Sequence, residues 1–372
     1  MELNYYMPTR VIMGKDCIRR NGPLFSETGS KAMIVTGARS ARSNGSLADI
    51  IGALDGEEIP YVIYDRVMSN PTTGCVYEGA ELAKKNQIDF IIGIGGGSPM
   101  DAAKAIALLA VQELTEDELF SGKYKREALP LIMVPTTAGT GSEVTPYSIL
   151  TNDKAQTKTS ISSPVLFPRL AFLDAAYMSE LTMVTTINTA LDALSHAIEG
   201  TLSVRASELT DRLAEASIGT IAGALNELAA WKEKGYPISL GVREKLLYGS
   251  MLAGMVISHT GTTAVHSMGY SLTYFKNIDH GRANGLVLPS FLRFIAKSDS
   301  TAIQKILTAM KLNSMDEFET LFLKLLGERE QISEEEIIKY SNIAIQAKNI
   351  NNSRIIPTKE DLVMLYSRSL TV

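Results

Sequence analysis

Runs of consecutive apolar residues recur through the first half of the chain, and they predict strands that are covered on both faces. The clearest runs are Ala32–Thr36, Tyr61–Tyr64, Phe90–Ile94 and Leu131–Val134. A strand of a parallel sheet is buried by helices on both sides, so it is apolar at every position rather than at every second one. Stretches of helical character separate the runs, for example residues 76–85 and 100–111. This alternation predicts a doubly wound parallel α/β sheet.

The pattern changes near residue 180, after which strand-like runs are few and helical periodicity dominates. Breaks between the helices are expected at Gly200, at residues 235–237 and near Gly281. The length of 372 residues also favours two domains. We therefore expect an α/β domain over residues 1–178 and an all-α domain over residues 179–372.

Composition and charge narrow the function classes. The net charge is −5 and the charged residues form no basic stripe, which argues against a nucleic-acid partner. No apolar run reaches about 18 residues, so we expect no membrane span. The N-terminus lacks the pattern of a signal peptide, and the two cysteines, Cys17 and Cys75, form no C-x-x-C pair. Free thiols suit a reducing compartment, so we expect a cytoplasmic protein.

A glycine-rich segment joins a predicted strand to a predicted helix. Gly95, Gly96 and Gly97 follow the apolar run and precede Ser98 and Pro99. Glycines let a backbone approach a bulky anion closely, and the free N–H groups at a helix start favour phosphate. The spacing Gly93-x-Gly95-x-x-Ser98 differs in its last residue type from the usual dinucleotide-binding fingerprint of three glycines. A tight structural turn and a phosphate cradle therefore both remain open for this loop alone.

A second loop of the same kind favours a nucleotide site. Residues 135–143 also follow a strand and are rich in small and hydroxyl-bearing residues, among them Thr136 and Thr137. Hydroxyl groups donate hydrogen bonds to phosphate or ribose oxygens. Because ligands of open α/β sheets bind at the carboxyl ends of the strands, the two loops together predict a dinucleotide site.

Three of the four histidines join an aspartate in a pattern typical of a metal site. Asp192 and His196 are four residues apart in an apolar segment, which places both side chains on one face of a helix. A buried carboxylate without a partner is costly, and a divalent metal would remove that cost. His266 and His280 could complete a donor set suited to Fe²⁺ or Zn²⁺. The alternative is an ordinary pair on a helix surface.

Other polar residues lie near these positions in the sequence. His259 is seven residues before His266, and we interpret it as a core or supporting histidine rather than a ligand. Glu199 and Asp279 flank the candidate ligands and either orient them as hydrogen-bond acceptors or lie on the surface. Arg282 either pairs with a substrate carboxylate or is a structural charge.

Together these motifs resemble the iron-containing (group III) alcohol dehydrogenase family, whose fold is similar to that of dehydroquinate synthase. The resemblance covers most of the chain and is loose after about residue 300. The motifs that carry it are residues 6–14, Asn70–Thr72, Gly95–Lys104, Pro135–Thr145, Asp192–Glu199 and His280–Asn284. It implies an N-terminal dinucleotide-binding domain, a helical C-terminal domain and a metal in the cleft.

The resemblance assigns roles to individual residues. It implies that Asp192, His196, His266 and His280 hold one divalent ion, which places the last two next to the reacting atoms. We expect Fe²⁺ in the cell, with Zn²⁺ as an alternative after aerobic purification. The cofactor contacts expected from the resemblance and the glycine loop are Asn70, Gly95, Gly96, Gly97, Ser98, Asp101, Thr136, Thr137 and Lys158. Dimers are common in the family, so we expect a homodimer.

Two positions depart from the family pattern. Tyr270 stands where many members have a histidine that is thought to help with substrate or proton transfer, and a phenol does not titrate near pH 7. We count Tyr270 as a candidate catalytic residue on the substrate side, and a packing tyrosine is the alternative. NAD-preferring members have an aspartate against the ribose where this chain has Gly37. Because Arg39, Ser40 and Arg42 follow and can bind a phosphate, we expect NADP(H) to be preferred over NAD(H).

The expected activity is the reversible interconversion of a small alcohol, diol or hydroxy acid with its carbonyl form. A bound metal would lower the pKa of the alcohol oxygen, and hydride would pass between the substrate carbon and the nicotinamide. Alternatives are a dehydroquinate-synthase-like lyase, a hydroxy-acid dehydrogenase such as a 4-hydroxybutyrate type, and a non-catalytic metal-binding protein. The set of one aspartate and three histidines argues against the lyase. The sequence does not name the substrate.

Overall fold

The computed structural model describes residues 3–371, which form two compact units. The first, which we call the sheet unit, comprises Tyr6–Thr137 and Gly141–Glu180. The second, the helical unit, comprises the residues from Leu181 on, the loop Ala138–Thr140 and the N-terminal residues up to Tyr5. The domain boundary between residues 178 and 179 stays a prediction.

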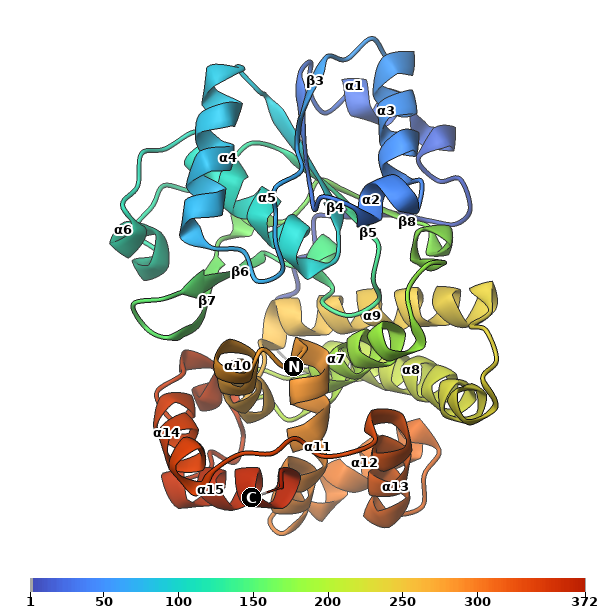
Figure 1. Cartoon of the computed structure of the whole chain (residues 1–372), viewed down its shortest axis with the longest axis vertical. Coiled ribbons are helices and arrows are strands. Elements are labelled where there is room, and N and C mark those ends of the chain that lie inside the picture. Colours follow the sequence, from blue (N-terminus) through green and yellow to red (C-terminus); the bar gives the residue numbers. More distant parts are fainter. Residues whose placement is uncertain (1–2, 372) are drawn as a thin grey trace. The chain divides into compact units, whose positions relative to one another are not determined.

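A six-stranded sheet forms the centre of the sheet unit (Figure 1). Its strands are, in spatial order, β1 (Arg10–Met13), β8 (Leu170–Leu173), β5 (Leu131–Pro135), β4 (Phe90–Gly95), β2 (Ala32–Thr36) and β3 (Tyr61–Tyr64). Every adjacent pair runs parallel, and Ala32 of β2 lies between Tyr61 and Phe90. The predicted doubly wound parallel sheet is therefore confirmed.

Helices cover both faces of this sheet, which explains the continuous apolar runs. The helices of the unit are α1 (Pro23–Ser26), α2 (Ser40–Ser43), α3 (Ser46–Gly56), α4 (Thr73–Lys85), α5 (Gly97–Leu109) and α6 (Glu116–Ser121), with 3₁₀ turns at Arg19–Asn21, Ser142–Val144, Pro164–Leu166 and Ala175–Met178. In β2, Met33 and Val35 join a core with α4 and α5 residues. Ala32 and Ile34 join a second core with α3 residues. Successive side chains thus enter opposite cores, as the pleat of a strand requires.

Four strands differ from the sequence-based expectation. The hairpin of β6 (Tyr147–Asn152) and β7 (Thr157–Ser162) is antiparallel and was not expected, because its residues are mostly polar and partly exposed. The short strand β8 at Leu170–Leu173 was not predicted either. Within the motif at residues 6–14, only Arg10–Met13 form a strand. Apolar periodicity therefore found the central strands and missed short or edge pairings.

The helical unit contains no strand among its described residues, so the predicted helical C-terminal part is confirmed. Its helices are α7 (Met183–Thr201), α8 (Glu208–Lys234), α9 (Leu240–Thr260), α10 (Ala264–Lys276), α11 (His280–Ala296), α12 (Ser300–Met310), α13 (Met315–Leu326), α14 (Glu334–Ala344) and α15 (Lys359–Ser369), with a 3₁₀ turn at Lys348–Asn352. Within residues 3–371, no helix has the length and apolar content needed to cross a bilayer.

Helix α7 lies at the centre of the helical unit, where it contacts α8, α9 and α11. From Ala190 to Gly200 every residue is buried, which is the pattern of a helix that is covered on all sides. The break expected at Gly200 falls just after it, because α7 ends at Thr201 and α8 begins at Glu208. A Cβ at this glycine would lie 2.2 Å from Val256 Cγ1, so its absence allows α9 to approach closely.

A fully buried lysine organises the loop that follows β5. Lys104 of α5 has no exposed surface, and its ammonium group donates to the carbonyl oxygens of Ser142, Thr145 and Tyr147 at 2.6, 2.8 and 2.8 Å. The hydroxyl of Ser142 bridges to the carboxylate of Asp101 at 2.7 Å. Burial lowers the pKa of Lys104 to about 8. The charge is held in place because the surrounding oxygens replace the water that it has lost.

Replacement of this lysine should destabilise the sheet unit. In Lys104→Met, the carbonyl groups of Ser142, Thr145 and Tyr147 lose the ammonium donor, at about 1–3 kcal/mol for each one left unsatisfied, while removal of the buried charge returns part of that cost. We expect Tm to fall by roughly 5–10 °C, measured by thermal unfolding monitored by circular dichroism. Lys85→Met, at an exposed position of α4, is the control and should change Tm by less than about 2 °C. Equal Tm values for the two variants would contradict this account.

Candidate metal centre

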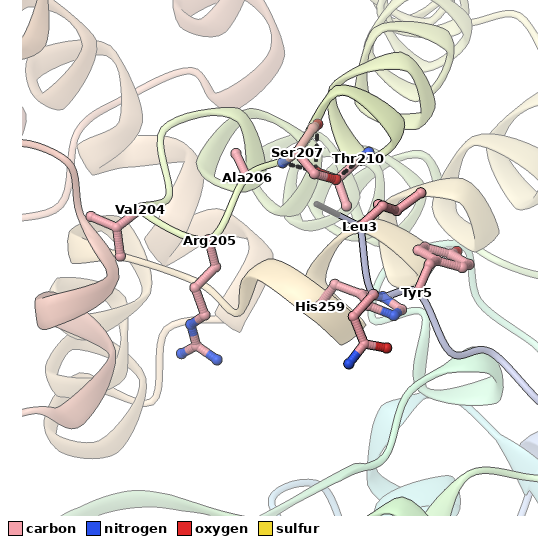
Figure 2. A pocket seen from close by; sticks show the side chains of 9 residues that line it. Leu3, Tyr5, Val204, Arg205, Ala206, Ser207, Thr210 and His259 are labelled. Atoms are coloured by element: carbon pink, nitrogen blue, oxygen red, sulfur yellow. Dashed lines mark hydrogen bonds between the residues drawn. The ribbon is translucent and has the colours of Figure 1, made fainter. Parts of the chain in front are cut away.

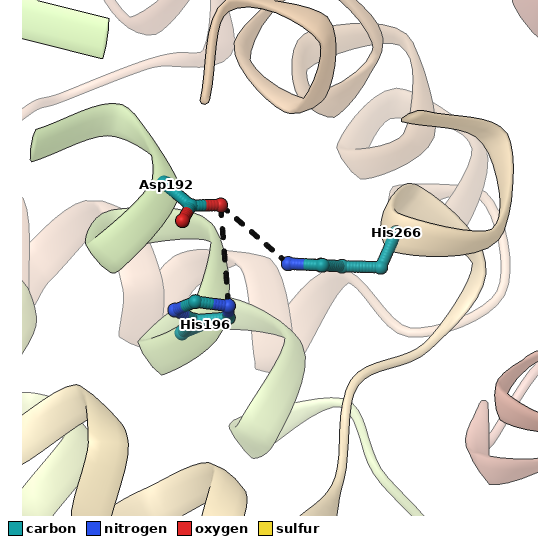
Figure 3. A group of neighbouring side chains, drawn as sticks. All are labelled: Asp192, His196 and His266. Atoms are coloured by element: carbon teal, nitrogen blue, oxygen red, sulfur yellow. Dashed lines mark ion pairs between the residues drawn. The ribbon is translucent and has the colours of Figure 1, made fainter. Parts of the chain in front are cut away.

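Four candidate ligands lie on three helices of the helical unit. Asp192 and His196 lie one turn apart on α7, His266 lies in the first turn of α10, and His280 is the first residue of α11. Asp192, His196 and His266 are buried, and their ligand atoms all lie within 4.8 Å of one another. Figure 3 shows both imidazoles turned toward the carboxylate of Asp192.

A glycine allows the fourth candidate to reach this group. Gly281 follows His280 at the start of α11, and a Cβ there would lie 1.9 Å from the carbonyl oxygen of Asn188 on α7. Only a glycine fits so close to another backbone. The break expected near Gly281 in fact lies before α11, and the glycine serves the contact between α11 and α7.

One carboxylate oxygen is the centre of the cluster. Asp192 Oδ1 lies 3.9 Å from His196 Nε2, 3.6 Å from His266 Nε2 and 3.8 Å from His280 Nε2. Two ligand atoms that each lie about 2.0–2.2 Å from one ion are roughly 3.3–3.6 Å apart in a tetrahedron. The three separations from Asp192 Oδ1 exceed this range by 0.3 Å at most, which is compatible with ligands of one ion, although the group whose ligand atoms all lie within 4.8 Å of one another comprises Asp192, His196 and His266 without His280.

The other nitrogen of each imidazole faces an acceptor. His196 Nδ1 lies 3.3 Å from the carbonyl oxygen of Gly139, and His280 Nδ1 lies 3.3 Å from Thr273 Oγ1. His266 Nδ1 faces the carboxylate of Glu199. When Nδ1 carries the proton toward such an acceptor, the Nε2 lone pair is free for a metal. All three rings can therefore present Nε2 to the same point.

The electrostatics of the cluster favour a positive charge. Burial opposes ionisation of Asp192, yet the nearby imidazoles outweigh it and hold the pKa of Asp192 well below its usual range. Burial lowers the pKa of His196, and the negative charge of Asp192 offsets this lowering only in part. Burial acts in the same direction on His266, but the carboxylates of Glu199 and Asp192 raise its pKa to about 9. Buried carboxylates that stabilise a cation also stabilise a divalent metal ion.

Asn284 of α11 closes one side of the cluster, and sequence reasoning missed it. Its side-chain nitrogen donates to Asp192 Oδ1 at 2.9 Å and lies 3.1 Å from His266 Nε2. Its side-chain oxygen is buried and lacks a hydrogen-bond partner among the described residues. A Cβ at Gly269 would lie 2.0 Å from that oxygen. Asn284 belongs to the motif that begins at His280, but nothing in its spacing indicated this contact.

The remaining histidine lies in a different environment. The ring of His259 stacks on Tyr5 at 4.0 Å between centroids, and its Nδ1 lies 2.9 Å from Ser258 Oγ. Figure 2 shows these two rings at a cavity of about 260 Å³, which Arg205 and Thr210 also line. Its contacts therefore agree with the interpretation of His259 as a packed histidine rather than a ligand.

Tyr270 contacts two of the candidate ligands. Its ring stacks on His280 at 5.4 Å between centroids and meets His266 edge-on at 6.2 Å. Arg282 points elsewhere: its guanidinium donates to Glu330 at 2.6 Å and to the carbonyl oxygen of Leu326 at 2.7 Å. Arg282 thus has the structural role that the sequence left open, and its hydrogen bonds do not suggest a substrate contact.

The two loops expected at the cofactor lie at one end of the six-stranded sheet, after β4 and after β5. Ser98 Oγ accepts a hydrogen bond from the backbone of Asn70 at 3.1 Å, and Thr136 N donates to the carbonyl oxygen of Gly95 at 2.9 Å. A Cβ at Gly96 would lie 3.2 Å from Thr137 Oγ1. Gly97 begins α5, and Lys158 lies on β7. The two loops predicted from the sequence therefore lie side by side.

Asp101, also expected at the cofactor, is occupied within the protein. Its carboxylate accepts hydrogen bonds from Ser142 Oγ at 2.7 Å and from the backbone of Ile149 at 3.1 Å, and it is only 8% exposed. These contacts join α5 to the loop after β5. They give Asp101 a part in shaping the loop in addition to any contact with a cofactor.

The residues expected at the ribose phosphate lie around the start of α2. Arg39 and Ser40 are exposed there, and Arg42 donates to Asp65 at 2.9 Å. A Cβ at Gly37 would lie 3.3 Å from the carbonyl oxygen of Val67. Sequence reasoning missed Asp65, which pairs with one of the two arginines across 23 residues of chain.

Comparisons with known proteins match both parts of the chain to one enzyme family. Residues 8–175 match the family model of iron-containing alcohol dehydrogenases, and residues 186–370 match that of the C-terminal domain of the same family. The lactaldehyde reductase of Escherichia coli is 35% identical over 270 residues, which is 72% of this chain and 68% of that protein. The solved iron-containing alcohol dehydrogenase of Thermotoga maritima is 38% identical, with a TM-score of 0.90 over 99% of both chains.

Relatives with either nicotinamide cofactor are among the matches. An NADPH-dependent butanol dehydrogenase of Clostridium saccharobutylicum is 30% identical over 88% of this chain and 83% of its own length. An NAD-dependent methanol dehydrogenase of Bacillus methanolicus is 28% identical over 80% of this chain and 78% of its own. The two family models together span both units of the fold. The chain therefore belongs to the iron-containing alcohol dehydrogenase family, which makes it an alcohol dehydrogenase or aldehyde reductase that works with a divalent metal and NAD or NADP.

Proposed function

We propose that Asp192, His196, His266 and His280 hold one Fe²⁺ ion in the cell and that the enzyme interconverts small alcohols and aldehydes with NADP(H). The observation that carries this proposal is the convergence of three Nε2 atoms on Asp192 Oδ1, at 3.6 to 3.9 Å. Imidazole and carboxylate suit iron and zinc alike, and zinc binds such sites more tightly. Aerobically purified protein is therefore expected to contain some zinc.

The ion and the residues around it would have different roles in the reaction. The bound ion supplies Lewis acidity that polarises the alcohol or carbonyl oxygen. The buried carboxylate of Asp192 would lower the net charge of the ion, and the amide of Asn284 donates a hydrogen bond that orients that carboxylate. The helical unit thus holds the buried donor atoms of Asp192, His196 and His266 in a fixed arrangement, as a preorganised site requires.

The ligand assignment is tested by a matched pair of histidine variants. His280→Ala removes a ligand whose side chain is 23% exposed, so the fold should tolerate the change. We expect its metal affinity to fall by at least about tenfold, measured by chelator competition and by the metal content of the purified protein. His259→Ala is the control, because His259 stacks on Tyr5, and it should retain the metal. Full metal content in His280→Ala would refute the assignment.

The activity is tested by turnover of protein that has been loaded with Fe²⁺ without oxygen. A panel of small aldehydes, alcohols, diols and hydroxy acids is offered with each nicotinamide cofactor, whose absorbance reports hydride transfer. We expect turnover that disappears on chelation and returns with Fe²⁺. A dehydroquinate-synthase-like lyase would leave the cofactor spectrum unchanged over a full cycle, and a binding protein would show no turnover at all.

We also propose that Tyr270 lies on the substrate side of the ligands, because its ring stacks on His280. A phenol can donate a hydrogen bond to a substrate oxygen, although it does not titrate near pH 7. In the same assay, Tyr270→Phe should lower kcat/KM by about tenfold, the size of one lost hydrogen bond to a polar substrate group. Unchanged turnover and substrate preference would leave Tyr270 a packing residue.

The preference for NADP(H) is proposed from the residues around Gly37. Arg39 and Arg42 can bind the ribose phosphate, and no carboxylate occupies position 37 to repel it. Arg42 is already paired with Asp65, but both side chains are about half exposed, at 52% and 40%, so this pair contributes little and a phosphate can displace it. Charge-assisted hydrogen bonds of roughly 1.5–3 kcal/mol correspond to about one to two decades of preference.

Two substitutions at one position test this preference. Gly37→Asp should shift kcat/KM toward NADH by about ten- to a hundredfold, because its carboxylate repels the phosphate and accepts from the ribose hydroxyls. Gly37→Ala is the control for space alone, since its Cβ meets the carbonyl of Val67 at 3.3 Å without adding charge. It should leave the ratio of the two cofactors within about threefold. A parent enzyme that prefers NADH would overturn the proposal.

The assembly and location follow the same reasoning. We infer a homodimer from the family and a cytoplasmic location from the two free cysteines, Cys17 and Cys75. Sedimentation equilibrium of the metal-loaded protein measures the first.

A further inference from the structure

We propose that Glu199 is the positioning residue that makes His266 a metal ligand, by holding the proton of this ring on Nδ1 and leaving Nε2 free. This inference rests on the proposed ligand role of His266. Glu199 lies on α7, three residues after His196 and seven after Asp192, so one face of one helix carries all three groups. The sequence left Glu199 undecided between such a role and the surface, and its side chain has no exposed surface.

The two oxygens of this carboxylate have different partners. Oε1 accepts from the backbone N–H of Thr263 at 2.8 Å, from the hydroxyl of Thr263 at 2.7 Å and from the N–H of Val265 at 3.1 Å. Oε2 faces Nδ1 of His266. A buried carboxylate is tolerated only when its lone pairs are satisfied, and here both oxygens are engaged.

Oε1 takes the place of a missing helix cap. Thr263 is the N-cap of α10, but its own side chain makes no capping hydrogen bond. Glu199 reaches across from α7 and accepts from Val265 and, at 3.4 Å, from the N–H of His266, which are the positions that an N-cap oxygen serves. The same carboxylate therefore fixes the backbone of His266 through one oxygen and its ring through the other.

The other two histidine rings differ from His266 in the group that faces Nδ1. His196 and His280 have neutral Nδ1 partners, the carbonyl of Gly139 and the hydroxyl of Thr273, both at 3.3 Å. A charged acceptor forms a stronger hydrogen bond than a neutral one and makes the opposite nitrogen a better donor to a metal. On the other side of the ring, the amide of Asn284 lies 3.1 Å from Nε2, and without an ion this N–H donates only to an unprotonated nitrogen, a contact that a metal on the same lone pair would replace. Both contacts select the tautomer with the proton on Nδ1.

A glutamine at position 199 separates the two tasks of the carboxylate. Its carbonyl oxygen can still accept from Thr263 and Val265, so the cap on α10 survives. Its amide nitrogen must then face His266 Nδ1, and because it can only donate, the ring must move its proton to Nε2. In the opposite orientation, the two N–H donors of the amide would face the N–H and hydroxyl groups of Thr263 and the N–H of Val265, which are donors themselves. That orientation is therefore excluded. Glu199→Gln therefore keeps the fold and presents the wrong face of His266 to the metal.

The test compares Glu199→Gln with Thr263→Val, which removes only the hydroxyl contact to Oε1. We expect Glu199→Gln to weaken Zn²⁺ binding by about 10- to 100-fold, measured by chelator competition, with little change in Tm. Thr263→Val should bind Zn²⁺ within about threefold of the parent. Equal losses in both variants, or parent-like affinity in Glu199→Gln, would overturn the proposal.

A second measurement needs no metal. Ring ¹⁵N chemical shifts of the metal-free protein, recorded at alkaline pH where the His266 ring is neutral, report which nitrogen is protonated. We expect Nδ1–H in the parent and in Thr263→Val, and Nε2–H in Glu199→Gln. The same tautomer in all three proteins would refute the role of Glu199. If the parent shows the expected tautomer yet binds no metal at His266, the proposed function fails and the role of Glu199 in fixing the ring stands.

Discussion

The burial of the Asp192 carboxylate is the constraint on which the helical unit depends. A carboxylate that is 3% exposed requires positive charge or hydrogen-bond donors nearby, and here three imidazoles and one amide surround a single oxygen. These groups come from α7, α10 and α11, so the three helices must meet where Asp192 lies. The same contacts around Asp192 therefore determine both how the three helices pack and where the candidate ligands lie.

Two glycines allow the helices to pack this closely around Asp192. Gly281 lets α11 approach the backbone of α7, and Gly269 leaves room for Asn284. Neither glycine has a positive φ, so their role is space rather than backbone conformation. An alanine at Gly281 would place its Cβ 1.9 Å from a carbonyl oxygen and push His280 away from Asp192. The ligand set thus depends on residues that carry no functional group.

The sequence predicted what is local and missed what is remote. The central strands were predicted because continuous apolar runs report burial on both faces, and Asp192 and His196 were found because a helix repeats every four residues. The hairpin of β6 and β7 was missed because its polar residues carry no such signal. The roles of Asn284 and Asp65 depend on partners 92 and 23 residues away, and no spacing rule reports such contacts.

Both units use one buried charge to shape a loop, with opposite signs. Lys104 has only donors, so it gathers carbonyl oxygens of the loop after β5; Glu199 has only acceptors, so it gathers the N–H groups at the start of α10. A misplaced loop would leave either charge without partners, at a cost of several kcal/mol. That penalty disfavours alternative loop conformations more sharply than apolar contacts do, because apolar contacts tolerate sliding. The residues expected to bind cofactor and metal lie close to Lys104 and Glu199 in sequence. Their backbone is therefore held in the one conformation that satisfies these charges.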